Sequence, residues 1–155
     1  MEILKLDEKD VNKFTELIEL FGDVFEMEPF KKPSVRYLKD LLNKKDFLVF
    51  VAVKNKHIVG GLTAYSLNQY YSERPIAYIY DLAVNRTFQR QGIGKNLIKK
   101  VEEYCFENGF AEVFVQADKV DSYALDFYRS TNVTAEEQVV HFSYTLNKQI
   151  YNKTH

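Results

Sequence analysis

The chain has little of the chemistry on which several protein classes depend. Its 155 residues include one cysteine, Cys105, and no tryptophan. A single cysteine excludes an internal disulfide, which suits a reducing cytoplasm. No apolar run approaches the ~20 residues that a membrane-spanning helix needs, and the first residues lack the pattern of a signal peptide. The formal net charge of -1 gives no field that would attract nucleic acid or an anionic membrane. We therefore expect a cytoplasmic protein that binds neither nucleic acid nor membrane.

Glycine and proline are also sparse, with six and three residues, and they form no linker between domains. Since there is no repeat or low-complexity tract either, we expect one domain over residues 1–147 and a frayed tail over residues 148–155. The histidines His57 and His141 lack the spacing of metal ligands, so no metal site is expected.

What the chain does have is hydrophobic periodicity, which predicts a mixed α/β fold. Strands are predicted over residues 3–6, 47–53, 58–67, 76–84, 113–117 and 139–146. Helices are predicted from Asp7 or Asp10 to Gly22, from Ser34 to Leu42, over residues 93–107 and after Asp121 or Ser122.

The strand, helix and strand between residues 76 and 117 require a parallel pair with a right-handed crossover. The long β-α alternation of a doubly wound fold is missing. We therefore expect a mixed, mostly antiparallel sheet flanked by about four helices.

The most informative stretch is Gln89-Arg90-Gln91-Gly92-Ile93-Gly94, which lies between a predicted strand and a predicted helix. The first amides of a helix have no partners within it, and the helix dipole favours negative charge there. A side chain at Gly92 or Gly94 would keep an anion away from the backbone. Arg90 and Lys95 either add positive charge for an anion or lie at the surface. The pattern predicts a phosphate or pyrophosphate site, but without the Gly-Lys-Ser/Thr ending of a P-loop.

The order of this loop, a helix, a strand and a second motif resembles the GNAT-type N-acetyltransferases. The matching residues are Gln89, Gly92 and Gly94 in the loop, and Ala124, Leu125, Phe127 and Tyr128 in the later helix. The resemblance implies a GNAT-like fold in which the loop cradles the pyrophosphate of acetyl-coenzyme A.

A narrower resemblance, to the aminoglycoside 3-N-acetyltransferases, runs along almost the whole chain. Its most specific strings are Tyr78-Ile79-Tyr80-Asp81-Leu82-Ala83-Val84 and Val115-Gln116-Ala117-Asp118. This resemblance implies an amine of an aminosugar as the acceptor, and it suggests a homodimer.

The resemblance also implies which residues hold acetyl-coenzyme A. The backbone amides of Leu82, Ala83 and Val84 would bond its pantetheine arm and acetyl carbonyl, while their side chains form strand core. The other expected cofactor-binding residues are Gln89, Arg90, Gln91, Gly92, Ile93, Gly94 and Lys95.

Three residues are candidates for catalysis. Tyr128 carries a phenol with an ordinary pKa near 10, so it can give a proton to a leaving sulfur, or it is a core tyrosine of its helix. Asp81 and Asp118 lie in or at the end of apolar strands, where a carboxylate needs a partner or a cleft. Each binds a substrate ammonium, or takes its proton through water, or accepts a structural hydrogen bond from loop amides.

Other residues are expected near the acceptor because a polyamine needs carboxylates around it. Glu136 and Glu137 either supply that charge or form a solvated turn. Together with Asp81, the expected substrate-binding residues are Tyr80, Glu26, Glu136 and Glu137, and Glu28, Tyr70 and Tyr71 lie in loops that could wall the site.

The sequence thus favours an acetyl-coenzyme A-dependent N-acetyltransferase for a small aminosugar. Two alternatives stay open: acetylation of a protein N-terminus, lysine or metabolite amine, and a non-catalytic acyl-coenzyme A sensor. Cys105 lies on the inward face of its predicted helix and is expected in the core rather than as a nucleophile.

Overall fold

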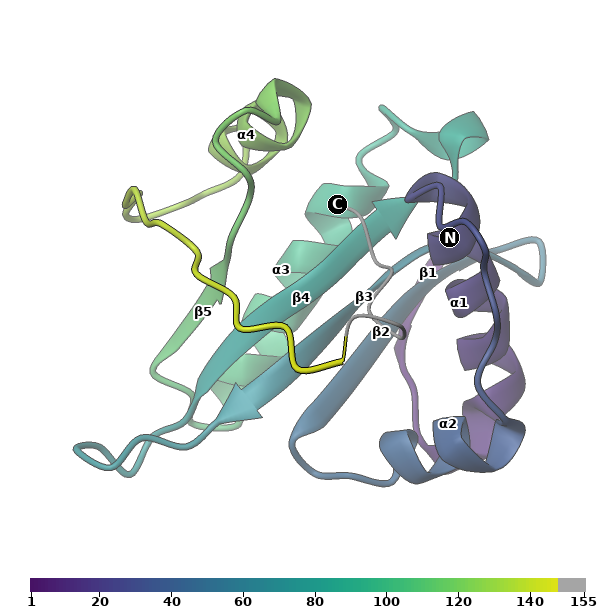
Figure 1. Cartoon of the computed structure of the whole chain (residues 1–155), viewed down its shortest axis with the longest axis horizontal. Helices are drawn as coiled ribbons and strands as arrows, with labels where there is room; N and C mark the ends of the chain where they lie inside the picture. The colour runs from purple at the N-terminus through teal and green to yellow at the C-terminus, as the bar shows by residue number, and fades with distance from the viewer. Residues whose placement is uncertain (148–155) are drawn as a thin grey trace. The chain divides into compact units, whose positions relative to one another are not determined.

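A five-stranded sheet organises the computed structural model, which describes residues 1–147 (Figure 1). The strand order is β1-β2-β3-β4-β5. Neighbours from β1 to β4 pair antiparallel, and β5 pairs parallel with β4. The strands are β1 (Glu2–Lys5), β2 (Phe47–Lys54), β3 (His57–Leu67), β4 (Ile76–Val84) and β5 (Glu112–Val115). The expected mixed, mostly antiparallel sheet and its one parallel crossover are confirmed.

Helices begin at the capping residues that the sequence predicts. Asp7 Oδ1 accepts a hydrogen bond from Lys9 N at 2.8 Å in the 3-10 turn before the first helix, whose own N-cap, Asp10, makes no side-chain cap hydrogen bond. Ser34 Oγ accepts one from Tyr37 N at 3.1 Å, and Asp121 Oδ1 accepts one from Ala124 N at 3.0 Å. None of the helices within residues 1–147 is both long and apolar enough to cross a membrane. The helices are α1 (Val11–Val24), α2 (Val35–Leu42), α3 (Ile93–Glu107) and α4 (Ser122–Arg129), with short 3-10 turns η1 (Glu8–Asp10) and η2 (Arg86–Phe88).

The chain divides into two compact units, one up to Val115 and one from Gln116 onward, which we describe separately. The first unit contains the whole sheet and α1 to α3, and the second contains α4. A single domain over residues 1–147 stays a prediction.

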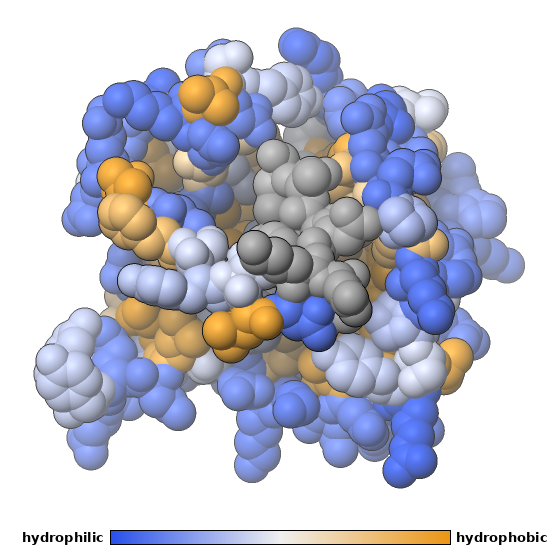
Figure 2. Space-filling view, viewed as in Figure 1, coloured by the Kyte–Doolittle hydropathy of each residue, from blue (hydrophilic) through white to orange (hydrophobic). Residues whose placement is uncertain are grey.

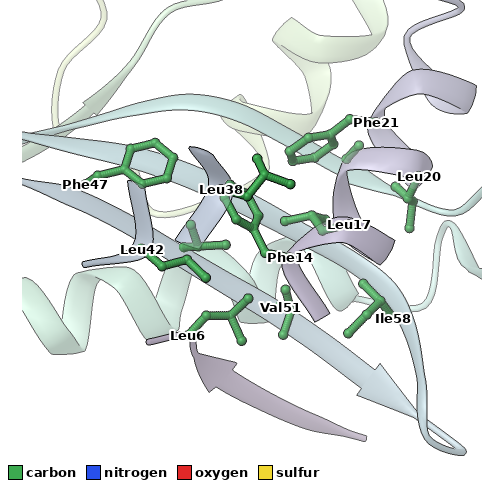
Figure 3. Packing of buried hydrophobic residues seen from close by; sticks show 12 residues of the cluster. Leu6, Phe14, Leu17, Leu20, Phe21, Leu38, Leu42, Phe47, Val51 and Ile58 are labelled. Atoms are coloured by element: carbon green, nitrogen blue, oxygen red, sulfur yellow. The ribbon is translucent and has the colours of Figure 1, made fainter. Parts of the chain in front are cut away.

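The core of the first unit lies on both faces of the sheet. Alternate residues of β2 point to opposite faces: Phe47 packs with Phe14 of α1, at 6.0 Å between ring centroids, and Phe50 packs with Tyr104 of α3, at 5.7 Å. Figure 3 shows the cluster beneath α1 and α2. Hydrophilic residues cover most of the surface seen in Figure 2. Each apolar side chain buried in the core contributes about 1.5–3 kcal/mol to the stability of the fold.

Gly22 has a different role from the predicted one. The sequence places it at the end of a helix, whereas α1 continues to Val24 and Gly22 is buried within it. A Cβ at this position would lie 2.8 Å from the Phe30 ring. The glycine therefore permits close approach of the following loop instead of ending the helix.

The strand predicted over residues 139–146 is wrong, because the structure gives this segment no strand and no ladder partner. Its apolar residues Val140, Phe142, Tyr144 and Leu146 are 77% to 97% exposed. Alternation predicts which face of a strand is apolar, but it does not supply the neighbouring edge with which the backbone must pair. The tail predicted over residues 148–155 lies outside the described residues.

Candidate active site

The connection between β4 and α3 is held by its own polar side chains. Asn85 N donates to Val59 O at 2.8 Å, and Asn85 Oδ1 accepts from Thr87 N at 2.9 Å. Gln89 Nε2 donates to Val84 O at 3.0 Å, so the loop folds back onto the end of β4. Gln89, predicted to bind the cofactor, therefore also fixes the shape of the loop.

The loop then enters α3 through two residues with left-handed backbone. Arg90 has φ of 63° and Gly92, the N-cap of α3, has φ of 82°. No side chain caps the helix, and a Cβ at Gly92 would meet nothing within 4 Å. The helix start is anchored by Ile93 and Gly94, which are buried, whereas Lys95 is exposed.

This geometry suits a diphosphate. Left-handed residues next to a helix start turn successive N–H groups toward one side and make an anion-binding concavity. The uncapped helix adds its own donors and its dipole. Arg90, Gln91 and Lys95 are exposed around these amides. The residues present therefore fit the pyrophosphate of acetyl-coenzyme A.

Arg86 ties the same connection to the end of α1. Its guanidinium lies 3.3 Å from Asp23 Oδ2 and donates to Asp23 O at 3.2 Å and Val24 O at 3.4 Å. Arg86 Nη2 is also 3.6 Å from Glu26 Oε1. Glu26, predicted to bind substrate, thus lies beside the β4–α3 connection and faces a cation of the protein itself.

The two parallel strands stop pairing before β4 ends. The β4–β5 ladder runs from Ile76↔Glu112 to Ile79↔Val115. Residues Leu82, Ala83 and Val84 pair with β3 alone, opposite Leu62, Gly61 and Gly60. Their edge away from β3 therefore has no ladder within the described residues. Because N–H groups alternate in direction along a strand, only alternate amides of the three face that edge.

A β-bulge lies where the β4–β5 ladder ends. Thr63 of β3 pairs with Asp81, but the next residue, Ala64, pairs with Ile79, so Tyr80 is an extra residue in β4. Ring contacts of Tyr80 with Tyr65 and Tyr78 place it on the face that Asp81 also occupies. Bulges turn side chains in this way and recur beside active sites.

The remaining candidates lie in the second unit. Tyr128 of α4 is half-buried, and its ring lies 5.0 Å from that of Phe127. Asp118 Oδ1 accepts a hydrogen bond from Val120 N at 3.1 Å, as expected for the structural alternative. Tyr128 and Asp118 belong to the second unit, and their roles in the reaction stay predictions.

Glu136 is engaged by a neighbouring arginine. Its Oε1 and Oε2 accept bonds from Arg129 Nε and Nη2 at 2.9 and 2.8 Å. This bidentate pair lowers the pKa of Glu136, first through the hydrogen bond and then through the arginine charge. Glu137 is exposed in the same segment. Of the two acids, Glu136 already has its charge balanced within the protein.

Several other expectations concern exposure. Tyr70 and Tyr71 are 99% and 72% exposed in the loop after β3, and Glu28 is exposed in the loop after α1. Cys105 is buried, and burial raises its thiol pKa to about 11. A nucleophilic cysteine needs a lowered pKa, so the expectation of a core residue is confirmed.

Sequence reasoning missed two residues near the bulge, Tyr65 and Tyr78. Both contact Tyr80, at 5.7 and 5.8 Å between ring centroids. Tyr78 stands in the string that leads into Asp81, but the strand register was needed to align Tyr65 of the preceding strand with it.

Known proteins are similar to this chain over most of its length. Residues 14–132 match the "Acetyltransferase (GNAT) family". N-alpha-acetyltransferase 30 of Homo sapiens is 28% identical over 120 residues, which are 77% of this chain and 32% of that protein. The chain thus spans about a third of the length of this curated relative and of its Mus musculus counterpart.

Solved structures show similarity over almost the full chain. Aminoglycoside acetyltransferase meta-AAC0020, from an uncultured soil metagenomic sample, is 62% identical in its trehalose complex (TM-score 0.92) and 61% in its sisomicin complex (TM-score 0.93). Each alignment covers 94% of this chain and 96% of that chain. Aminoglycoside N-acetyltransferase AAC(6')-Iy in complex with CoA shares the fold, at 14% identity and a TM-score of 0.72 over 93% and 99% of the two chains.

The family match covers most of the described residues and includes the uncapped start of α3, the divergence of β4 from β5 and α4. The chain therefore belongs to the acetyltransferase (GNAT) family.

Proposed function

We propose that the protein transfers an acetyl group from acetyl-coenzyme A to an amine of an aminosugar of the aminoglycoside type. The observation that carries the acetyl-coenzyme A part is the β4–α3 connection, where an uncapped helix start and two left-handed residues present backbone donors. The acceptor class is supported by the 61% identity to meta-AAC0020, whose structure contains sisomicin.

The loop supplies binding and orientation. Amides at the start of α3 hold the diphosphate, and Arg90 and Lys95 add positive charge at the rim. Gln89 keeps the loop on Val84 O, so these donors are fixed before any ligand arrives. Preorganised donors cost little ordering entropy on binding.

The edge of β4 beyond the ladder positions the reacting carbonyl. Acetyl-coenzyme A, when bound, supplies the acetyl group as a thioester. Those amides of Leu82, Ala83 and Val84 that face this edge orient and polarise its oxygen, and removing one such donor typically costs about 3–4 kcal/mol of transition-state stabilisation. Asp81 binds an ammonium of the acceptor, Asp118 takes through water the proton that the attacking amine loses, and Tyr128 Oη donates a proton to the leaving sulfur.

A coenzyme A release assay tests the proposal. Purified protein with acetyl-coenzyme A is offered sisomicin, a panel of other aminoglycosides, and trehalose, which has no amine. We expect release with amine-bearing sugars and none with trehalose. Absence of turnover with every aminoglycoside, despite acetyl-coenzyme A binding by calorimetry, would overturn the acceptor and favour an acyl-coenzyme A sensor.

A second acceptor class rests on the 28% identity to N-alpha-acetyltransferase 30. Short peptides with an unblocked N-terminus are the matching probes in the same assay. Release with peptides and not with aminosugars would replace the aminoglycoside proposal with this one.

A further inference from the structure

Four aromatic residues line up across one face of the sheet. Phe47, Tyr65, Tyr78 and Phe114 are successive cross-strand partners on β2, β3, β4 and β5. The rings of Phe47 and Tyr65 are 5.3 Å apart, and those of Tyr78 and Phe114 stack at 4.7 Å with an angle of 1°. Cross-strand aromatic pairs of this kind stabilise a sheet and hold its side chains in place.

The bulge adds a further ring to this row. Tyr80 lies 5.7 Å from Tyr65 and 5.8 Å from Tyr78, nearly perpendicular to each, at 87° and 84°. We refer to Tyr65, Tyr78 and Tyr80 as the aromatic platform. Edge-to-face contacts at these distances hold the rings against one another, and the ring faces that reach the surface can attract a cation.

The row passes from the core to the surface. Phe47 is 8% exposed beneath α1 and α2, whereas Tyr65 is 37% and Tyr80 43% exposed. The buried end fixes the row, and Tyr65 and Tyr80 reach the surface.

The charges around the platform are negative. Asp81 follows Tyr80 and lies on the same face. Burial, then Tyr37, Asp81 and Asp46, raise the pKa of Tyr65. Burial and then Asp81 do the same for the pKa of Tyr78. Aromatic faces beside carboxylates favour a cation over a neutral or anionic ligand.

We propose that the aromatic platform, with Asp81 at its edge, binds a protonated amino group and its sugar ring on the acceptor, apart from the amine that is acetylated. The reacting amine must be neutral to attack, whereas the other amines of a polyamine stay charged and available to π faces and carboxylates. This proposal rests on the proposed function and assigns the platform a role in acceptor recognition.

The absence of tryptophan from the chain allows a direct test. A Tyr80→Trp variant carries a single tryptophan on the platform and keeps an aromatic face there. We expect its emission to change when sisomicin is added, with saturation at the Kd measured by calorimetry. The matched control is Phe106→Trp, since Phe106 is 86% exposed on α3, across the sheet. Its emission should stay constant.

Replacement variants test the energetic role. Tyr80→Leu and Tyr65→Leu should each raise the Kd for sisomicin by about 2- to 30-fold, the range of a lost cation–π contact. Tyr80→Phe keeps the ring and should stay within about twofold of wild type. The KM for acetyl-coenzyme A should be unchanged in all three, which separates acceptor binding from general damage.

The outcomes separate this proposal from the proposed function. Suppose that the wild-type protein acetylates sisomicin, but sisomicin leaves the emission of Tyr80→Trp unchanged and binds Tyr80→Leu as tightly as wild type. The platform then serves only to pack the sheet, and this proposal is wrong. If no aminoglycoside supports coenzyme A release, the proposed function fails first. An equal response of Tyr80→Trp to trehalose would show recognition of the sugar ring without the charge, which also contradicts the proposal.

Discussion

Tyr128 has the clearest proposed role at the scale of single residues. It lies on α4, half-buried beside Phe127. The sequence could predict the residue because a motif marks it. Its chemistry was not predictable from pattern alone, because a core tyrosine has the same helical spacing.

Tyr128→Phe removes the phenol hydroxyl and keeps the aromatic ring. We expect kcat to fall by about 10²–10⁴-fold, the usual contribution of a general acid, with little change in acetyl-coenzyme A affinity. Steady-state kinetics and calorimetry on the same preparation measure both. An unchanged kcat would assign the proton donor to another group.

The ion pair of Glu136 could not be predicted from the residue alone. A carboxylate in a loop predicts a substrate contact and an internal ion pair equally well, and the structure gives it Arg129 as partner. The partner is seven positions away along a turn with no periodic spacing, so no sequence rule would have paired them.

At the scale of elements, the two ends of α3 make a natural comparison. Gly92 at its start and Gly109 after its end have φ of 82° and 77°, and a Cβ at either would meet nothing within 4 Å. Replacing either by alanine costs roughly 1–2 kcal/mol, because an L side chain strains a left-handed backbone.

Only one of the two positions is expected to affect acetyl-coenzyme A. Gly92→Ala should raise its Kd by about 10- to 100-fold, equivalent to one lost hydrogen bond to a charged group. Gly109→Ala should lower the melting temperature to a similar extent but leave that Kd unchanged. Calorimetry and thermal melting of both variants supply the comparison, and equal affinities would mean that the diphosphate lies elsewhere.

The elements themselves were largely predictable, and the irregularities were not. Apolar runs and capping residues predicted five of the six proposed strands and all four helices, with small shifts at their ends. The bulge at Tyr80 was hidden, because residues 76–84 are apolar almost throughout and show no alternation that an extra residue could interrupt. The strand prediction for residues 139–146 failed for the opposite reason. Their alternation is clear, but they pair with no strand edge within the described residues.

For the molecule as a whole, stability is concentrated in one part of the chain. Among residues 1–147, the buried hydrophobic residues all lie between Leu6 and Cys105. The family resemblance is confirmed, whereas the binding of acetyl-coenzyme A by the β4–α3 loop, a homodimer and a cytoplasmic location stay predictions.

Hydrogen exchange should reproduce this distribution. We expect amides of β2, β3 and α3 to exchange only through global unfolding, which in a domain of this size costs about 5–15 kcal/mol. Residues 131–147 should exchange fastest, because they carry no ladder or helix. Mass spectrometry of peptic fragments measures both, and slow exchange within residues 139–146 would mean that this segment is paired in solution after all.

The extra residue of β4 has a consequence for how the strand tolerates change. Deleting one amino acid from an ordinary strand inverts the facing of everything beyond it. Here the ladder with β3 already skips Tyr80, joining Ile79 to Ala64 and Asp81 to Thr63. Excising Tyr80 would leave Asp81 and Ala83 pointing as they do now, so the facing of the end of β4 does not depend on the presence of this residue.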